Sequence, residues 1–264
     1  MVVYLQLKKK KETTVANFHI KKRIWKVIFS FLKSIKNLHT NNQRTLRIFI
    51  EAIWYIIRTG CQWRLLPYYY GKWRTIHKRY KDWCSKGIWE KLMTHVSDPD
   101  TEYIMLDATI VRAHGCSAGF YKFTSHKEAL GRSKGGFTTK IHALVDALGN
   151  PLRFLLTPGN RHEMAQARAL LKGYQSDYTI ADKGYSSKKL VKTIEYNDQI
   201  AVIPSKSNSK TIRIYDESIY KERHLVENFF SKIKHFRRVF SRFDKYAYVY
   251  MSALYFVGAL IWLA

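Results

Sequence analysis

Three acidic residues, Asp107, Asp182 and Glu227, are the first candidates for chemistry, because acidic residues are scarce in this chain. Asp107 interrupts the apolar run at 104–106, and Asp182 directly follows 179–181. A carboxylate on a buried strand is costly unless it is paired, hydrogen-bonded or bound to a metal ion. Each aspartate alone could also be a strand-end cap or a turn residue.

The third acid lies in a helical pattern with other polar residues. Tyr220, Arg223, Glu227 and Lys234 are separated by 3, 4 and 7 residues, which places them on one face of a helix together with Phe230. An acid flanked by two bases on an inward face is costly in a core but suits the wall of an active site. The alternative is a surface ion-pair face, since Arg223 and Glu227 are an i, i+4 pair.

A mixed sheet is predicted to position these acids. Alternating and apolar runs predict strands at 103–112, 178–181 and 200–204, and two strands within 140–156 that meet at a turn over 147–150. Helices are predicted at 187–195 and, as one long helix, at 216–240. Strands first, then strands and helices alternating, indicate an α/β fold with a mixed sheet flanked by helices.

The first part of the chain has a different, helical pattern. Helices are predicted at 42–59, 72–85 and 88–96, and together they resemble a helix-turn-helix module. The turn-forming cluster at 97–100 separates an N-terminal helical DNA-binding domain, 1–97, whose residues 1–40 are poorly defined, from a catalytic domain, 98–264. Arg74 and Lys78 are the candidates to face DNA phosphates, although exposed basic residues can simply be solvated.

Charge points to a polyanionic partner. The chain has 46 Lys and Arg against 20 Asp and Glu, a formal charge of +26, which makes nucleic acid the first candidate and an anionic membrane surface the rival. The uncharged segment 246–264 approaches the length of a membrane span but is better interpreted as a buried core helix. The three cysteines show neither a disulfide nor a zinc pattern, and the N-terminus lacks a secretory signal.

Several segments together resemble one known family. Tyr220-x2-Arg223-x3-Glu227-x6-Lys234 matches the signature of the transposases of insertion-sequence families four and five. The surrounding sequence resembles family five from about residue 44 onward, in these segments: EAIWYIIRTGCQWRLLP at 51–67, LDATIVRAHG at 106–115, LGRSKGGFTTKIHALVDALGNPLRFLLTPGNRHE at 130–163, IADKGY at 180–185 and LVENFFSKIKHFRRVFSRFDK at 225–245. Residues 1–40 lie outside the resemblance.

The resemblance implies a DDE transposase with an RNase H-like fold. Asp107, Asp182 and Glu227 would then be the catalytic residues and would hold two Mg²⁺ ions, with Mn²⁺ as a substitute. Arg223 and Lys234 would orient the scissile strand and Tyr220 would stack on or bond to DNA. The implied partners are double-stranded DNA, at the element ends and at the target, and a second copy of the chain in the active complex.

The implied function is to bind the terminal inverted repeats of an insertion sequence, cleave the strands and transfer them, in the bacterial cytoplasm at the nucleoid. A DNA-binding repressor without transposition and an RNase H-fold nuclease with another substrate are the rival functions. Arg132 and Lys134, in a glycine-rich loop at 132–136, are secondary candidates for phosphate contact. Asp146 is expected to be a turn residue, and the histidines expected to be structural are His114, His142 and His162.

Overall fold

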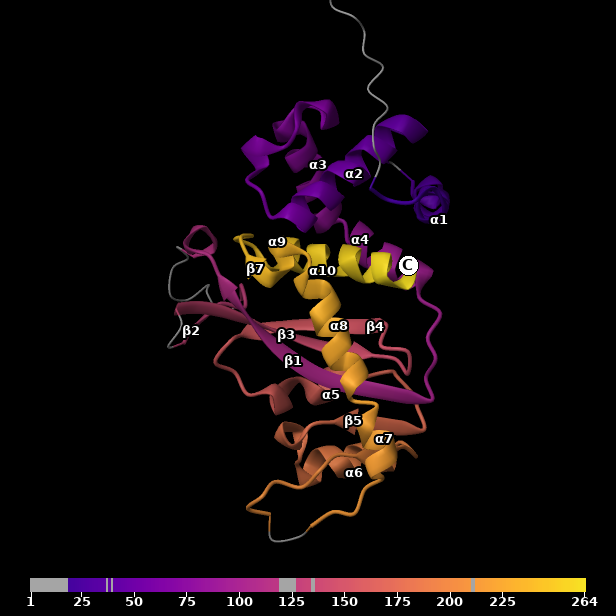
Figure 1. Cartoon of the computed structure of the whole chain (residues 1–264), viewed down its shortest axis with the longest axis vertical. Coiled ribbons are helices and arrows are strands. Elements are labelled where there is room, and N and C mark those ends of the chain that lie inside the picture. The colour runs from indigo at the N-terminus through magenta and orange to yellow at the C-terminus, as the bar shows by residue number, and fades with distance from the viewer. Residues whose placement is uncertain (1–18, 37, 39, 119–126, 134–135, 210–211) are drawn as a thin grey trace, which may run out of the picture.

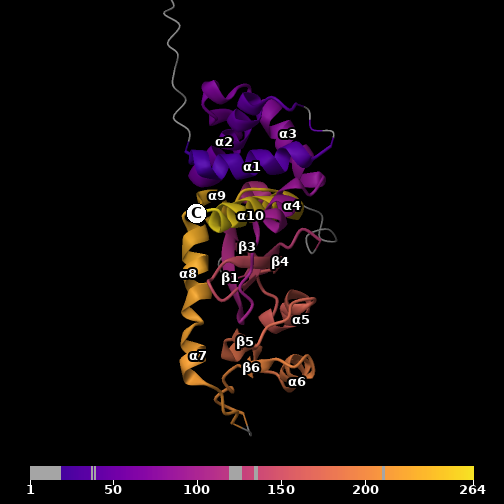
Figure 2. The same cartoon turned by 90° about the vertical axis from the view of Figure 1, so that its right-hand side faces the viewer.

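The computed structural model describes residues 19–36, 38, 40–118, 127–133, 136–209 and 212–264. The molecule has a helical layer at one end, a sheet in the middle and short helices at the other end (Figure 1). Helices α7 (Glu217–Lys221) and α8 (His224–Lys234) run along one side of the sheet and lead up to the helical layer (Figure 2).

Four helices form the N-terminal part: α1 (Lys22–Ser34), α2 (Gln43–Thr59), α3 (Trp73–Ser85) and α4 (Ile88–Val96). The predictions of α2, α3 and α4 are confirmed, and α1 is an addition within the segment that the sequence left undefined. Asn42 caps α2 by accepting the amide of Thr45, and Gly60 ends it with a φ of 67°. A Cβ at Gly60 would lie 2.9 Å from Cβ of Arg237, so this helix end also contacts the C-terminal part closely.

The sheet has seven strands: β1 (Tyr103–Ala113), β2 (Gly131–Ser133), β3 (Gly136–Val145), β4 (Pro151–Pro158), β5 (Tyr178–Ala181), β6 (Ile200–Val202) and β7 (Ser241–Arg242). The central strand β1 pairs antiparallel with β3, which pairs antiparallel with β4. On its other side β1 pairs parallel with β5, and β5 pairs parallel with β6. This mixed sheet flanked by helices is the RNase H-like fold that the sequence predicted.

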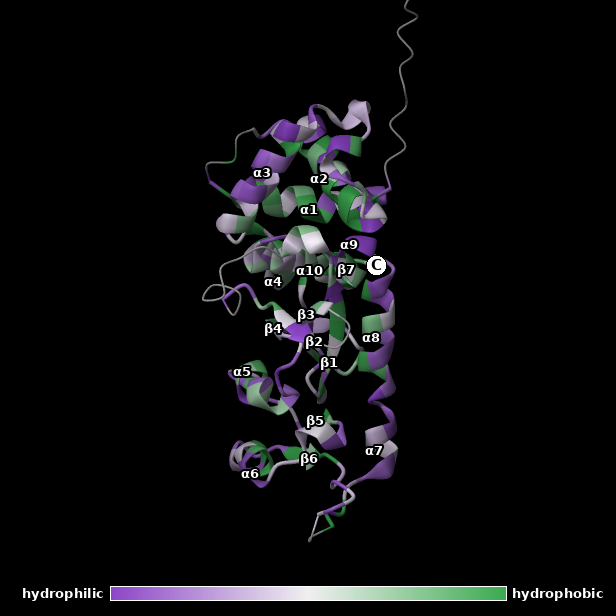
Figure 3. Cartoon of the chain, turned by 90° about the vertical axis from the view of Figure 1, so that its left-hand side faces the viewer, coloured by the Kyte–Doolittle hydropathy of each residue, from purple (hydrophilic) through white to green (hydrophobic). Residues whose placement is uncertain are grey.

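Helices cover both faces of the sheet: α5 (Ala167–Leu171) and α6 (Lys188–Tyr196) on one, and α7 (Glu217–Lys221), α8 (His224–Lys234), α9 (Arg237–Phe240) and α10 (Ala247–Trp262) on the other. The prediction of one long helix over 216–240 is wrong, because the segment is divided into α7, α8 and α9. The second break is at Phe236, whose backbone is extended. Both polar and apolar residues occur along α7 and α8 (Figure 3), as expected for helices with one face on the sheet.

The uncharged helix α10 is a core element, as predicted. It packs against α4 on one side and β4 on the other, and most of its residues are buried. Gly258 permits this approach, because a Cβ there would lie 2.6 Å from Sδ of Met93 and 3.2 Å from Cγ of Pro151. Within the described part of the chain, no helix is both long enough and apolar enough to cross a membrane. One apolar core therefore runs from the N-terminal helices through α10 to the sheet.

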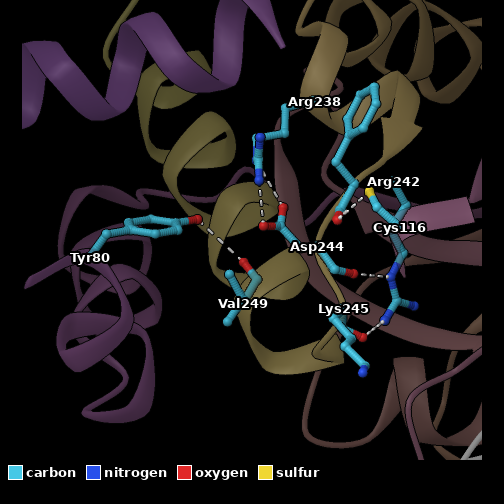
Figure 4. A network of polar contacts seen from close by, with 8 residues as sticks. Tyr80, Cys116, Arg238, Arg242, Asp244, Lys245 and Val249 are labelled. Carbon is cyan, nitrogen blue, oxygen red and sulfur yellow. Dashed lines mark hydrogen bonds and ion pairs between the residues drawn. The ribbon is translucent and has the colours of Figure 1, made fainter. Parts of the chain in front are cut away.

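A buried polar network fixes the segment after α8 (Figure 4). Arg238 forms a bidentate ion pair with Asp244: Nε lies 3.0 Å from Oδ2, and Nη2 lies 2.8 Å from Oδ1. Arg242, fully buried, donates to the carbonyls of Glu128, Asp244 and Lys245 and to the hydroxyl of Thr139. Arg242 also belongs to β7, which pairs with β1 at Ala113. The network therefore holds the segment that follows α9 against the central strand.

We expect Arg242→Met to lower the free energy of unfolding by about 3–5 kcal/mol, because the buried and half-buried oxygen atoms that Arg242 contacts would lose their donor. Urea denaturation followed by circular dichroism measures this change. Arg237→Met, at an exposed neighbouring position, should change stability by less than about 0.5 kcal/mol. Equal effects of the two substitutions would contradict a structural role for the buried network.

Candidate active site

Two of the predicted acids lie side by side on neighbouring strands, at the point where β5 ends. Leu106 of β1 pairs with Ala181 of β5 in parallel register, so the next residue along each strand is an aspartate, Asp107 and Asp182. Asp182 ends its strand and caps the following 3-10 turn η5 (Lys183–Tyr185), accepting the amide of Gly184 at 2.8 Å. Parallel pairing thus brings two distant positions of the sequence together.

Arg223 connects the third acid to this pair. Its Nη1 atom lies 3.5 Å from Oδ2 of Asp107, and its Nη2 atom is hydrogen-bonded to Oε1 of Glu227. The side chain of Asp107 is 17% exposed and that of Glu227 is 53% exposed. The arginine therefore offsets a carboxylate on the sheet and one on α8 at the same time.

A tightened turn sets the direction of Arg223. The amides of Glu222, Arg223, Leu225 and Val226 each bond to the carbonyl three residues earlier, instead of four. This 3-10 stretch separates α7 from α8 inside the sequence signature. Tyr220 lies just before it, with its ring centroid 5.9 Å from Cζ of Arg223. Arg223 thereby lies close to Asp107, and the ring of Tyr220 lies beside Arg223.

Burial and charge act on Asp107 in opposite directions. Loss of solvent raises its pKa to about 6, although the amide of Ala108 donates to Oδ1 at 2.7 Å and Arg223 lowers the pKa. The negative charges of Asp182 and Glu163 act in the same direction as burial, and the value of about 6 includes all of these effects. Like charges close together, only partly offset by one arginine, create a site that favours an added cation.

Other predicted site residues stand apart from the three acids. Lys234 is on α8 but exposed, and Arg132 is exposed on the edge strand β2. Arg74 and Lys78 are exposed on α3, in the helical layer. Lys134 lies outside the described residues.

The predicted turn residue and two of the three histidines have local partners. Asp146 is a turn residue, as expected, and accepts the amides of Leu148 and Asn150. His142 is buried, with Nε2 2.8 Å from Oγ1 of Thr157, and burial lowers its pKa to about 4. His114 accepts the amide of Cys116 through Nδ1.

Two residues near the acids were not singled out in the sequence. Glu163 begins the 3-10 turn η4 (Glu163–Gln166), and its Oε1 atom lies 3.0 Å from Nζ of the buried Lys140. Tyr185 ends η5, is fully buried, and its hydroxyl has no hydrogen-bond partner among the described residues. Glu163 is the last residue of the family-like segment 130–163. Its contact with Lys140 of β3 is seen only in the folded structure.

Carboxylate oxygens are the donors that hard divalent cations prefer, and Asp107, Asp182 and Glu227 supply them. Within the described residues, no three acidic, histidine or cysteine side chains are grouped closely enough to enclose a metal ion. The carboxylate of Glu227 is bonded to Arg223 instead. The donor chemistry therefore fits a divalent cation, while the third donor is engaged by a cationic side chain.

Comparison with known families agrees with this geometry. The model of the family described as "Transposase DDE domain" matches residues 98–249. This chain belongs to that family. The family described as "Putative transposase of IS4/5 family" matches residues 20–93, and so includes α1, which the sequence interpretation had left out. The chain is therefore a transposase of the insertion-sequence type, and DDE domains in general use divalent metal ions.

Individual relatives of this DDE transposase are bacterial. A protein of Brucella ovis named "Putative transposase for insertion sequence element IS6501" is 41% identical over 131 residues, covering 48% of this chain and 98% of the relative. "Uncharacterized protein y4sN" of Sinorhizobium fredii is 34% identical over 100 residues, covering 36% of this chain and 77% of that protein.

Among solved structures, a piggyBac transposase synaptic complex with hairpin DNA is similar, with a TM-score of 0.41 and 12% identity. The similarity covers 74% of this chain and 51% of that one, so the chain spans about half the length of that protein.

The raised pKa of Asp107 predicts a pH-dependent stability in the absence of metal. The folded chain holds this proton up to about pH 6 while the unfolded chain releases it near pH 4, so the residue's stabilising contribution falls as pH rises between these values. Asp107→Asn should therefore stabilise the transposase more at pH 7.5 than at pH 4, by up to about 3 kcal/mol. Urea denaturation in EDTA tests this, with the exposed Glu195→Gln as control. A difference that does not vary with pH would contradict the assignment.

Proposed function

We propose that this transposase binds the terminal inverted repeats of an insertion sequence and catalyses metal-dependent strand cleavage and strand transfer. The observation that supports this best is the placement of Asp107 and Asp182 at adjacent strand positions, with Arg223 joining Asp107 to Glu227. A nuclease with another substrate would account for the acids but not for the helical layer. A DNA-binding repressor would account for the helical layer but not for the acids.

Asp107, Asp182 and Glu227 would hold two Mg²⁺ ions, with Mn²⁺ as a substitute. Bound there, the ions would activate the attacking hydroxyl and stabilise the leaving oxygen. The carboxylates must be ionised to bind a cation, so a proton on Asp107 competes with it below about pH 6. In the absence of a metal ion, the guanidinium of Arg223 offsets the negative charges of Asp107 and Glu227.

The cationic residues of the signature would act on the DNA backbone. Arg223, at the border between α7 and α8, can reach a phosphate from the side of Asp107 and stabilise the charge that builds up on it. Lys234, exposed farther along α8, would contact the same strand at a distance from the cleaved bond. Tyr220 presents a partly exposed ring for stacking. Water first, and then the freed 3′ hydroxyl, would attack phosphorus directly, with no covalent protein–DNA intermediate.

Recognition of the element ends would fall to residues 1–97, and catalysis to residues 98–264. Arg74 and Lys78 stand one turn apart on α3, exposed, while Ile76 and Tyr80 of the same helix are buried. This places two positive charges on the outer face of the helical layer. Arg132 on the edge strand β2, together with Lys134, would add further phosphate contacts. A homodimer would pair the two DNA ends.

Cleavage of a labelled duplex that carries the terminal repeat of the element tests the catalytic assignment. With Mg²⁺, the wild type should nick the 3′ end, and Glu227→Gln should lower the rate by roughly 10²–10³-fold, because removing a ligand charge costs several kcal/mol of transition-state stabilisation. Glu222→Gln, on the tightened turn before α8, serves as the matched control and should retain near wild-type cleavage.

Two other results would change the proposal. Binding of the duplex without nicking by the wild type would favour the DNA-binding-only alternative. Equal loss in Glu222→Gln and Glu227→Gln would show that the helix, and not the carboxylate of Glu227, matters.

Salt dependence tests the role of α3. Each DNA phosphate that is no longer neutralised by a cationic side chain should reduce the slope of log Kd against log salt concentration by about 0.9, so Arg74→Ala combined with Lys78→Ala should reduce it by roughly 2. Lys189→Ala combined with Lys192→Ala removes the same charge from the exposed face of α6, at the opposite end of the molecule (Figure 1). Equal reductions for the two pairs would mean that net charge, and not α3, determines binding.

A further inference from the structure

Tyr185 is a buried polar group that the fold leaves without a partner. Its side chain is 0% exposed and packs in the core beneath the sheet with Leu190 and Ile194, yet its hydroxyl is not hydrogen-bonded to any described residue. A buried donor without an acceptor is unfavourable, and such groups are rare in folded proteins. Tyr250, which is equally buried, shows the usual arrangement: its hydroxyl donates to the carbonyl of Val239 at 2.6 Å.

The hydroxyl of Tyr185 lies in the electrostatic field of three acids. Besides burial, the charges of Glu163, Asp107 and Asp182 raise the pKa of Tyr185, and Glu163 has the largest effect of the three. The turns η4 and η5, which carry Glu163 and Tyr185, pack against each other. The unpartnered donor therefore belongs to a turn that Asp182 caps and that packs against the turn of Glu163.

Glu163 is held on one side only. Lys140, buried on β3, donates to Oε1 of Glu163 and to the carbonyl of Arg161, at 3.0 and 2.9 Å. The other carboxylate oxygen, Oε2, has no donor among the described residues, and the side chain is 29% exposed. One donor without an acceptor and one acceptor without a donor therefore stand on two turns in contact.

We propose that Glu163 is a fourth carboxylate of the catalytic centre and that Tyr185 is the positioning residue that holds it there, by donating its hydroxyl to Oε2 when the site binds a divalent cation. Lys140 fixes one oxygen of Glu163 and Tyr185 fixes the other. The fixed negative charge beside Asp107 strengthens the attraction for the cation, and partners of this kind around metal-binding carboxylates commonly change metal affinity 10–100-fold. This inference rests on the proposed function, because it requires a cation at Asp107 and Asp182.

Two tyrosine variants of the full chain separate this role from a purely structural one. Tyr185→Phe keeps the packed ring and removes a hydroxyl that has no partner, so in EDTA its Tm should equal or exceed that of the wild type. Tyr250→Phe removes a satisfied hydroxyl at an equally buried position, so its Tm should fall by about 2–4 °C. A fall in Tm for Tyr185→Phe that matches Tyr250→Phe would overturn the proposal.

Binding of Mn²⁺ to the full chain without DNA, measured from the electron paramagnetic resonance signal of the free ion, gives a second readout. We expect Tyr185→Phe and Glu163→Gln each to raise the Kd about tenfold, and the double variant to resemble the single ones, because the two residues act as one unit. Tyr250→Phe and Glu195→Gln should leave the Kd unchanged. Additive losses, or no loss in either single variant, would overturn the proposal.

Asp107→Asn distinguishes failure of this inference from failure of the proposed function. If Asp107→Asn abolishes Mn²⁺ binding while Tyr185→Phe and Glu163→Gln bind like the wild type, the metal site stands and the fourth carboxylate does not. If the wild type binds no Mn²⁺, or Asp107→Asn binds equally well, both the metal site and this inference fail.

Discussion

A largely buried carboxylate on the central strand, that of Asp107, imposes the main constraint on this structure. Asp107 is tolerated because Ala108 donates to it and Arg223 approaches it from a helix that comes much later in the chain. That approach requires α7 and α8 to lie along the sheet, and the buried pair Arg238–Asp244 together with Arg242 keeps the segment after them on β1. The contact between Arg223 and Asp107 therefore stabilises the acid and also requires the C-terminal helices to pack along the sheet.

Much of the fold could be predicted because local patterns and tertiary packing agree. Alternating apolar residues gave β1, β4 and β5 nearly to the residue, and Asn42 and Gly60 marked both ends of α2. The prediction of one long helix over 216–240 was wrong, because the helical spacing of its apolar and polar residues continues through two breaks in the helix. The 3-10 turn at 222–226 and the extended Phe236 are set by contacts with the sheet and the N-terminal helices, which a single stretch of sequence does not contain.

Residues of the candidate site could be predicted where their type differs from that of the residues around them in the sequence. Asp107 and Asp182 stood out inside apolar strands, and Glu227 stood out within a spaced polar pattern; their assignment as catalytic residues stays a prediction. Glu163 and Tyr185 gave no such signal, because an acid in a polar turn and a tyrosine after a glycine are ordinary. Only folding brings β3, η4 and η5 together and exposes the mismatch of an unpartnered hydroxyl beside an incompletely paired carboxylate.

The position of α10 has a consequence for how the chain is made. Tyr80 bonds to the carbonyl of Val249, 169 residues later, and Glu90 accepts the hydroxyl of Tyr255, 165 residues later. During synthesis, the first helices therefore emerge from the ribosome long before the helix that completes their core. Contacts of such high sequence separation slow folding and leave apolar surface open in the meantime. The apolar surface of the nascent N-terminal helices must therefore be protected from aggregation until α10 has been synthesised.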